Sequence, residues 1–256
     1  MSLAPEARRR VLGVAGVVVV LLIWEAAARL GLINALLLAS PTAVGSAAVS
    51  ELKSGVIWSH LGASLLAFVL GLGLSAVVGI TIGLLAGWFR RVGYLVDPWL
   101  TILYSTPSVA LAPLILIAFG IELSSKVFVV FLFAVFPIAV NTIAGVHATA
   151  GRYLRVARSF SAPPWTVLRT VILPGALPYI ATGMRVAGGR ALVGIVVAEL
   201  IAGDAGIGYL LNLAGAMLKS GTLYLLVIIL GLSGMAYASL LGRLEDRLER
   251  WRPARG

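Results

Sequence analysis

Six apolar stretches, separated by short charged segments, constrain this chain more than any other feature of its sequence. A membrane-spanning helix needs about 20 consecutive apolar residues. A hydrophobic content of 60% with only 12% charged residues is too apolar for a soluble domain. We therefore predict an all-α membrane protein whose spans lie near residues 11–28, 61–89, 97–120, 125–146, 178–201 and 223–241. The first stretch could also be a signal peptide, because a basic start precedes it and small residues end it.

The distribution of Lys and Arg predicts which side of the membrane each loop faces. With six spans both termini lie on one side. That side holds 14 of the 20 basic residues, against 4 on the other side and 2 within the fifth predicted span. Because cytoplasmic loops are enriched in Lys and Arg, we predict that both termini are cytoplasmic. The charge of +10 flanks apolar runs instead of forming a patch on a soluble domain, so we expect no nucleic-acid partner.

Small residues recur at every fourth position of the second predicted span. This spacing places them on one helix face, where they allow close backbone approach and tight helix packing in lipid. The residues are Ala63, Ala67, Gly71, Ser75, Gly79, Gly83 and Gly87.

One cytoplasmic loop, residues 152–178, is both basic and rich in helix breakers. It holds four arginines and, in order, Ser161-Ala162, Pro163-Pro164 and Pro174. Proline suits the first turn of a helix and disrupts its interior. We predict a short helix at 152–160, a break, a second short helix at 164–172, and a long helix that starts near Pro174 or Pro178. Such a loop could dock a partner protein, or it could rest on anionic lipid.

The spacing within this loop resembles the EAA motif of ABC importer permeases. In that motif Glu-Ala-Ala is followed after three residues by Gly, after nine more by Ile, and after one more by Leu-Pro. The matching positions here are Arg155-Val156-Ala157, Ser161, Val171 and Leu173-Pro174. Three of them replace the Glu, Gly and Ile of the motif, namely Arg155, Ser161 and Val171. Shorter segments are also similar to the family: 39–44, Pro113-Leu114, Phe119 to Ile121, 198–200 and 206–209.

The chain is similar to permeases of nitrate, sulfonate, taurine and bicarbonate importers. The resemblance implies a type I importer bundle in the bacterial cytoplasmic membrane, which works as a homodimer or with a paired permease by alternating access. It implies two cytoplasmic ATPase subunits, which would hold ATP and Mg, and a periplasmic or lipid-anchored solute-binding protein. The implied substrate is a small anion such as nitrate, bicarbonate or an organic sulfonate. A vitamin precursor or an aromatic acid, carried by the same machine, is the alternative.

The resemblance also implies a division of the chain and a docking surface for the ATPase. Residues 1–61 would form the first span and an outer surface segment, residues 62–251 the core permease domain with a coupling loop at 152–172, and residues 252–256 a cytoplasmic tail. The residues expected to dock the ATPase are Arg155, Ala157, Arg158, Ser159, Ser161, Ala162, Pro163, Leu173 and Pro174.

Ionisable and polar residues inside the predicted spans are candidates for the translocation pathway, because buried charges in lipid are costly. Arg190 lies near mid-span, where it could attract an anion, make an internal salt bridge or contact a freed carbonyl. Arg185 and Glu199 could instead reach the two membrane surfaces. Asn141 could line the pathway or bond a carbonyl freed by Pro137. The candidate set is Pro107, Pro113, Asn141, Arg185, Arg190 and Glu199.

No motif in the sequence carries catalysis. The chain lacks a P-loop, so Walker-type ATP binding would have to come from a separate chain. It has no Cys and no His-Glu-x-x-His motif for a metal. We predict a transport subunit with no cofactor of its own, and not an enzyme. A stand-alone secondary transporter or channel is the second hypothesis. An inverted repeat would favour it, and we find no clear repeat between residues 1–120 and 121–256.

Overall fold

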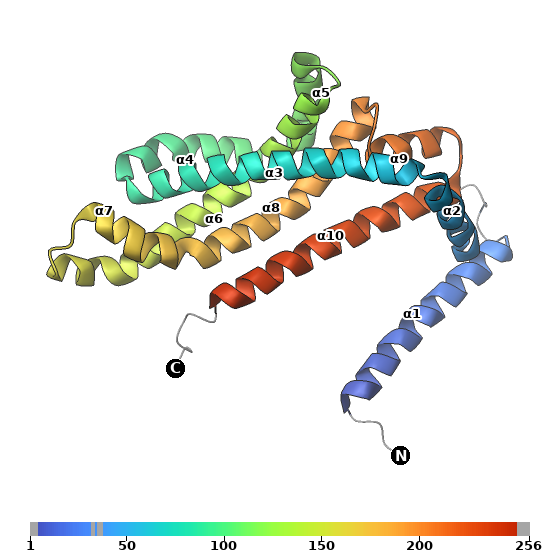
Figure 1. Ribbon diagram of the computed structural model, residues 1–256, viewed down its shortest axis with the longest axis horizontal. Coiled ribbons are helices and arrows are strands. Elements are labelled where there is room, and N and C mark those ends of the chain that lie inside the picture. The colour runs from blue at the N-terminus through green and yellow to red at the C-terminus, as the bar shows by residue number, and fades with distance from the viewer. Residues whose placement is uncertain (1–4, 32–33, 35–37, 250–256) are drawn as a thin grey trace. The chain divides into compact units, whose positions relative to one another are not determined.

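The computed structural model describes residues 5–31, 34 and 38–249, and over these residues the regular structure is helical (Figure 1). The chain divides into two compact units, and the described residues of each lie within 1–60 and 210–229, and within 61–209 and 230–256. The predicted tail, residues 252–256, lies outside the described residues. The elements are α1 (Pro5–Arg29), α2 (Pro41–Ser54), α3 (Val56–Trp88), α4 (Arg90–Ser105), α5 (Ser108–Phe119), α6 (Leu123–Ser159), α7 (Pro164–Val167), the π-helix η1 (Leu168–Ile172), α8 (Leu173–Ala202), α9 (Ile207–Ala216) and α10 (Ser220–Glu249).

In the first unit, the end of α1 is tied to the start of α2. The Glu25 carboxylate accepts hydrogen bonds from the Thr42 backbone N–H at 3.0 Å and from the Thr42 hydroxyl at 2.8 Å. Ser40 is the N-cap of α2, because its hydroxyl accepts from the Ala43 N–H at 3.2 Å. A carboxylate and a cap at a helix N-terminus both satisfy free N–H groups there. Ser40, Pro41 and Thr42 form a helix start signal in the sequence, from which we expected a short helix at 42–53. The observed helix agrees within one residue at each end.

In the second unit, the small-residue face of α3 packs directly on α6. A Cβ atom added at any of four glycines of α3 would lie within 3.0 Å of an atom of α6. Each partner side chain lies 59 positions further along the chain, so the two helices run parallel. The pairs are Gly71 with Val130, Gly79 with Ile138, Gly83 with Thr142 and Gly87 with Val146. The predicted tight face is confirmed.

Two further helices pack in sequence within this unit, α8 on α6 and α10 on α8. Glycine contacts again give the directions: α8 runs antiparallel to α6, and α10 runs antiparallel to α8. The pairs between α6 and α8 are Gly145 with Tyr179, Asn141 with Gly183, and Phe133 with Gly194. The pairs between α8 and α10 are Leu192 with Gly234, Gly188 with Tyr237, and Thr182 with Glu245.

The chain between α3 and α6 is bent sharply. Helix α4 packs on α3 and α6 through Val96 and Leu100, and the axis of α5 then turns from that of α4 by 97°. The break falls at Thr106, which is extended, because a residue before proline is disfavoured in the α conformation. We expected this helix to begin at Asp97-Pro98, and that prediction is wrong. It begins at Arg90, and Pro98 lies inside it.

Among the described residues, four helices are long and apolar enough to cross a membrane, or five if the bent pair α4–α5 counts as one span. They are Leu12–Arg29, Val56–Trp88, Leu123–Gly151 and Ser220–Glu245. Helix α8, which contains the predicted fifth span, carries Arg185, Arg190 and Glu199 and is not among them.

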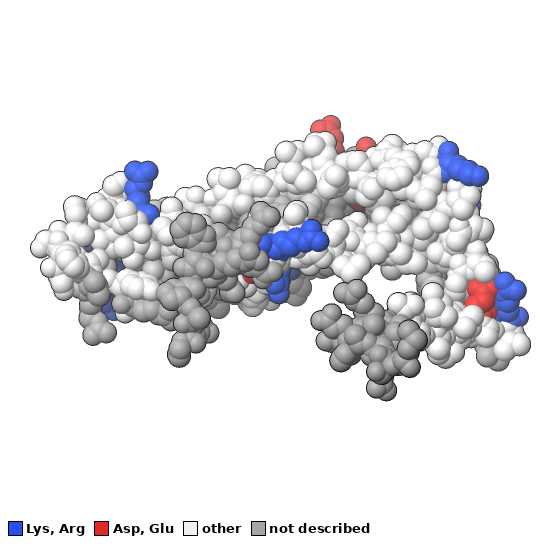
Figure 2. Space-filling model, turned by 60° about the horizontal axis from the view of Figure 1, so that its bottom comes forward, with Lys and Arg blue, Asp and Glu red and all other residues white. Residues whose placement is uncertain are grey.

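The core of the second unit follows α6. Its side chains at Val130, Ala134 and Ile138 are fully buried against α3 and α8. Large apolar side chains elsewhere face outward, for example Leu70, Val77 and Leu95 on α3 and α4. On the face drawn in Figure 2, the charged side chains among the described residues are few and scattered. Such a surface suits contact with hydrocarbon, where exposed charge is costly.

Candidate functional site

The proline-rich loop joins α6 to α7, and α6 extends further into it than predicted. The separate short helix predicted at 152–160 is wrong, because these residues are the last turns of the 37-residue α6. No proline lies between Pro137 and Pro163, so nothing stops the helix earlier. The predicted break is confirmed at residues 160–163, and helix resumes at Pro164, a favoured first position.

The end of α6 forms a Schellman motif. The N–H of Ala162 donates to the carbonyl of Ala157 at 3.2 Å, and the intervening Ser161 has a left-handed φ of 51°. Glycine is the usual residue at this position, since it has no Cβ to strain. Ser161 stands where the EAA motif has glycine. The left-handed backbone at this position explains why the motif uses glycine there.

The second short helix and the start of the next long helix lie as predicted. Helix α7 and η1 together cover residues 164–172, and α8 begins at Leu173. The junction is a π-turn, in which the Leu173 N–H donates to the Leu168 carbonyl. Pro174 cannot donate to the carbonyl four residues back, and a wider turn accommodates such a position. The chain from Pro164 to Ala202 therefore continues without a break.

The predicted docking residues divide between the inner and outer sides of this loop. Ala157 and Ala162 are partly buried and pack against a core cluster that includes Val167 and Ile172. The exposed members are Ser159, Ser161, Pro163, Leu173 and Pro174. The side chains of Arg155 and Arg158 lie outside the part of the chain that the structure describes.

Two aromatic side chains at the tip of the loop were missed by sequence reasoning. Phe160 is 81% exposed and Trp165 is 65% exposed. The Arg169 guanidinium lies 5.8 Å from the centre of the Trp165 ring. The signal was present in the sequence, since large aromatic residues are enriched at the anchors of protein interfaces and two of them lie in this basic proline-rich loop.

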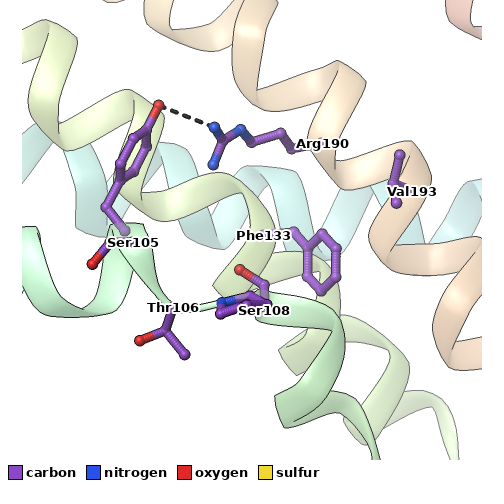
Figure 3. Close-up of a pocket in the computed structure, with 8 residues that line it drawn as sticks. Ser105, Thr106, Ser108, Phe133, Arg190 and Val193 are labelled. Carbon is purple, nitrogen blue, oxygen red and sulfur yellow. Dashed lines mark hydrogen bonds between the residues drawn. The ribbon is translucent and has the colours of Figure 1, made fainter.

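A pocket of about 300 Å³ lies at the break between α4 and α5 (Figure 3). Ser105, Thr106 and Ser108 lie along the break, and Arg190 extends over it from α8. Phe133 of α6 and Val193 of α8 form its apolar part. Tyr104 and Pro107 complete the lining.

Arg190 reaches an aromatic ring and not a carboxylate. Its Nη2 donates to the Tyr104 hydroxyl at 3.1 Å, and its guanidinium carbon lies 4.5 Å from the centre of the Tyr104 ring. Both contacts hold the guanidinium in place without neutralising its charge. None of the salt bridges within the described part of the chain includes Arg190, so its positive charge faces the pocket unpaired.

Of the other predicted pathway residues, only Pro107 joins Arg190 at the pocket. Pro113 lies within α5. The Asn141 amide donates to the carbonyl of Pro137 at 2.8 Å, which is the second of the two roles considered for it. Arg185 is ion-paired with Glu245 of α10 at 2.6 Å.

Glu199 is fully buried, and its hydrogen bonds hold a loop in place. Its carboxyl group accepts hydrogen bonds from the Ser64 hydroxyl at 2.7 Å and from the Gly208 N–H at 2.8 Å. The Ser64 oxygen in turn accepts from the Ile207 N–H at 2.8 Å. These bonds tie the first turn of α9 to α8 and α3, because the N–H groups at a helix start have no partner within the helix.

The same loop is held from α6 by a second contact. The Lys126 ammonium, whose side chain is 7% exposed, donates to the Asp204 carboxylate at 2.7 Å and to the Ala205 carbonyl at 3.1 Å. This hydrogen bond lowers the pKa of Asp204.

Comparisons with known proteins agree on one family. Residues 79–251 match the family described as the binding-protein-dependent transport system inner membrane component. The chain is 33% identical to an aliphatic sulfonates transport permease protein of Bacillus subtilis, over 91% of this chain and 85% of that protein. It is 32% identical to the taurine transport system permease protein of Escherichia coli, over 96% of this chain and 92% of that protein. It is also 32% identical to a formylaminopyrimidine transport permease protein of Halalkalibacterium halodurans, over 91% and 92%.

Two solved structures share the fold. A chain of the MetNI methionine ABC transporter in inward-facing conformations matches with a TM-score of 0.67 at 16% identity, over 77% of this chain and 98% of that one. A chain of an amino acid ABC transporter matches with a TM-score of 0.56 at 17% identity, over 79% and 97%.

Proposed function

The chain belongs to the family of inner membrane components of binding-protein-dependent transport systems, and we propose that it is the permease of an ATP-driven importer for a small anion. It is a transport subunit of an ABC importer and not an enzyme. ATP hydrolysis belongs to separate subunits of such importers, consistent with the absence of a P-loop in this sequence.

The proposed topology has six crossings, with both termini in the cytoplasm. Helix directions support it, because α3 and α6 run parallel and the bent pair α4–α5 must return the chain between them. Helix α8 must likewise return it between the parallel α6 and α10. Helix α1 supplies the remaining crossing, and the excess of Lys and Arg on one side sets the orientation.

The exposed aromatic tip of the 160–172 loop is the observation that carries the proposed coupling to an ATPase. Phe160 and Trp165 present apolar surface on a basic loop at the proposed cytoplasmic side. The loop is also rigidly attached, by the Schellman motif to α6 and by an unbroken helix to α8. If a partner bound at the tip moves, α8 should therefore move with it and should shift Arg190. A change of state can follow from ATP only if the partner binds the two states differently.

The proposed assembly contains two permease chains, identical or paired, two ATPase subunits and an outer solute-binding protein. Buried interfaces of this kind usually depend on a few aromatic or Arg side chains, whose truncation costs about 2 kcal/mol or more. We expect Trp165→Ala to weaken binding of the ATPase about 30-fold. Trp99, which is 66% exposed on α4, is the matched control. The measurement is co-purification of the ATPase with each variant. If Trp165→Ala and Trp99→Ala both lose the ATPase, or if both retain it, the proposed docking surface is wrong.

Two observations favour an anion as the cargo. Relatives over most of the chain are named as permeases for aliphatic sulfonates and taurine, and Arg190 presents an unneutralised charge at a pocket. The formylaminopyrimidine relative keeps a vitamin precursor as the second candidate. Uptake assays with an alkyl sulfonate and with an uncharged pyrimidine, in the presence of the matching binding protein, separate the two.

A further inference from the structure

We propose that the pocket at the α4–α5 break is a binding subsite for a small organic oxyanion with a short alkyl part. The inference rests on the proposed function, since it places part of the cargo's passage at a particular set of side chains. The lining combines one cationic residue, several hydroxyl groups and an apolar wall in about 300 Å³. That volume is at the small end of the range for ligand sites, and it suits a molecule of few heavy atoms.

The oxyanion would bind where hydrogen-bond donors converge. The guanidinium of Arg190 has five N–H groups, of which one is used on Tyr104. Because the Tyr104 oxygen accepts that bond, its own O–H is left to donate to a ligand. Ser108 adds a hydroxyl that has no partner within the described part of the chain, at the start of α5 where no side chain caps the helix. Charge-assisted bonds of this kind are the strong ones.

Two other hydroxyls in the lining play a different part. The Ser105 hydroxyl donates to the carbonyls of Thr101 and Ile102, and the Thr106 hydroxyl donates to that of Ile102 at 2.8 Å. Their protons are therefore used within the last turn of α4, and these residues shape the break without binding the anion as donors. The hydrogen-bond donors that remain for the anion are those of Arg190, Tyr104 and Ser108.

The apolar wall selects for an alkyl part on the ligand. Phe133 of α6 and Val193 of α8 form the apolar part of the lining. An inorganic anion would leave this surface unfilled, whereas a short alkyl chain would bury it at about 25 cal/mol per Å². A cationic ligand is disfavoured, because the described residues of the lining include no carboxylate to balance Arg190.

The test is direct binding of radiolabelled 1-butanesulfonate and methanesulfonate to the purified permease–ATPase complex in nanodiscs, without the binding protein. We expect Arg190→Gln to weaken both ligands about tenfold or more, as loss of a charge-assisted bond does. We expect Val193→Phe, which fills the apolar side, to weaken butanesulfonate several-fold more than methanesulfonate. Arg91→Gln, at an exposed arginine outside the pocket, serves as the matched control.

The outcomes separate the subsite from the permease function. ATP-dependent uptake by the wild-type complex is measured in the same preparation with the binding protein added. If uptake occurs but neither variant changes sulfonate binding, or if butylammonium binds as well as butanesulfonate, the subsite is wrong while the importer stands. If the wild-type complex shows no ATP-dependent uptake, the proposed function fails and the subsite falls with it. If the Arg190→Gln complex does not assemble, Val193→Phe alone tests the subsite. The subsite is wrong if this variant weakens butanesulfonate no more than methanesulfonate.

Discussion

The hydroxyl of Ser64 on α3 lies 2.7 Å from the carboxyl oxygen of Glu199 on α8, although 135 positions separate them in the sequence. Both residues are buried, and the N–H groups of Ile207 and Gly208 complete the network. A buried carboxyl group in a membrane protein is a candidate for function by default. Within the described residues, the hydrogen bonds of this carboxyl group are to groups that position the loop between α8 and α9, so we assign it a structural role.

Replacement of Glu199 should therefore reduce stability more than it changes transport by the folded protein. Glu199→Ala leaves the Gly208 N–H and the Ser64 hydroxyl without their acceptor. Unsatisfied buried groups of this kind cost about 1–3 kcal/mol each. We expect a clearly lower melting temperature in detergent, with a smaller effect for Ser64→Ala. If Glu199→Ala has the same melting temperature as the wild type, the structural role is wrong.

The glycine face of α3 offers a matched pair of substitutions. A Cβ at Gly83 would lie 2.4 Å from the Cβ of Thr142 and 2.9 Å from the Ala139 carbonyl, whereas a Cβ at Gly73 would meet nothing within 4 Å. Gly83→Ala should destabilise the protein by about 1–3 kcal/mol through overpacking. Gly73→Ala should be neutral or slightly stabilising, because Ala favours the helix. Equal melting temperatures for the two variants would show that the parallel contact of α3 and α6 is wrong.

Ser161 holds a backbone conformation that favours glycine. Its φ of 51° belongs to the left-handed region, which costs a residue with a Cβ about 1 kcal/mol. Ser161→Gly should therefore raise the melting temperature, and Ser161→Val should lower it, since a β-branched side chain tolerates this region least. The measurement is thermal unfolding of the purified permease. A lower melting temperature for the glycine variant would contradict the Schellman geometry.

The contact between Asp204 and Lys126 predicts a dependence on pH. Because the pKa of Asp204 is lowered from 3.8 in the folded chain, the contact adds stability above that value and loses it as pH falls through the lowered pKa. The difference in melting temperature between wild type and Asp204→Asn should be steady near neutral pH and should vanish under strong acid. A difference that is the same at both extremes would mean that the ion pair contributes nothing.

Local signals explain the parts of the fold that the sequence predicted well. The start of α2 follows from Ser40 and Pro41, and the helix at 164–172 follows from Pro163-Pro164, because caps and prolines act on their immediate neighbours. The tight face of α3 follows from a period of four in small residues. Pro98 shows the limit of such signals, since tertiary packing of α4 on α3 and α6 keeps the helix intact through it.

The candidate site was only half visible in the sequence, for a physical reason. Arg190 and Pro107 could be chosen singly, because a charge or a proline in an apolar span is conspicuous. Their meeting at one pocket depends on the 97° bend between α4 and α5, which no local pattern specifies in size or direction. The contacts of Glu199 could not be predicted for the same reason, since its partner Ser64 comes from a distant helix.

The most direct test of the account is uptake of labelled alkyl sulfonate into proteoliposomes that contain this chain with its ATPase and binding protein. The account predicts uptake that requires ATP and both partners, and that falls with ATPase binding in Trp165→Ala but not in Trp99→Ala. Uptake by proteoliposomes that contain this chain alone would contradict it and would identify a stand-alone carrier or channel.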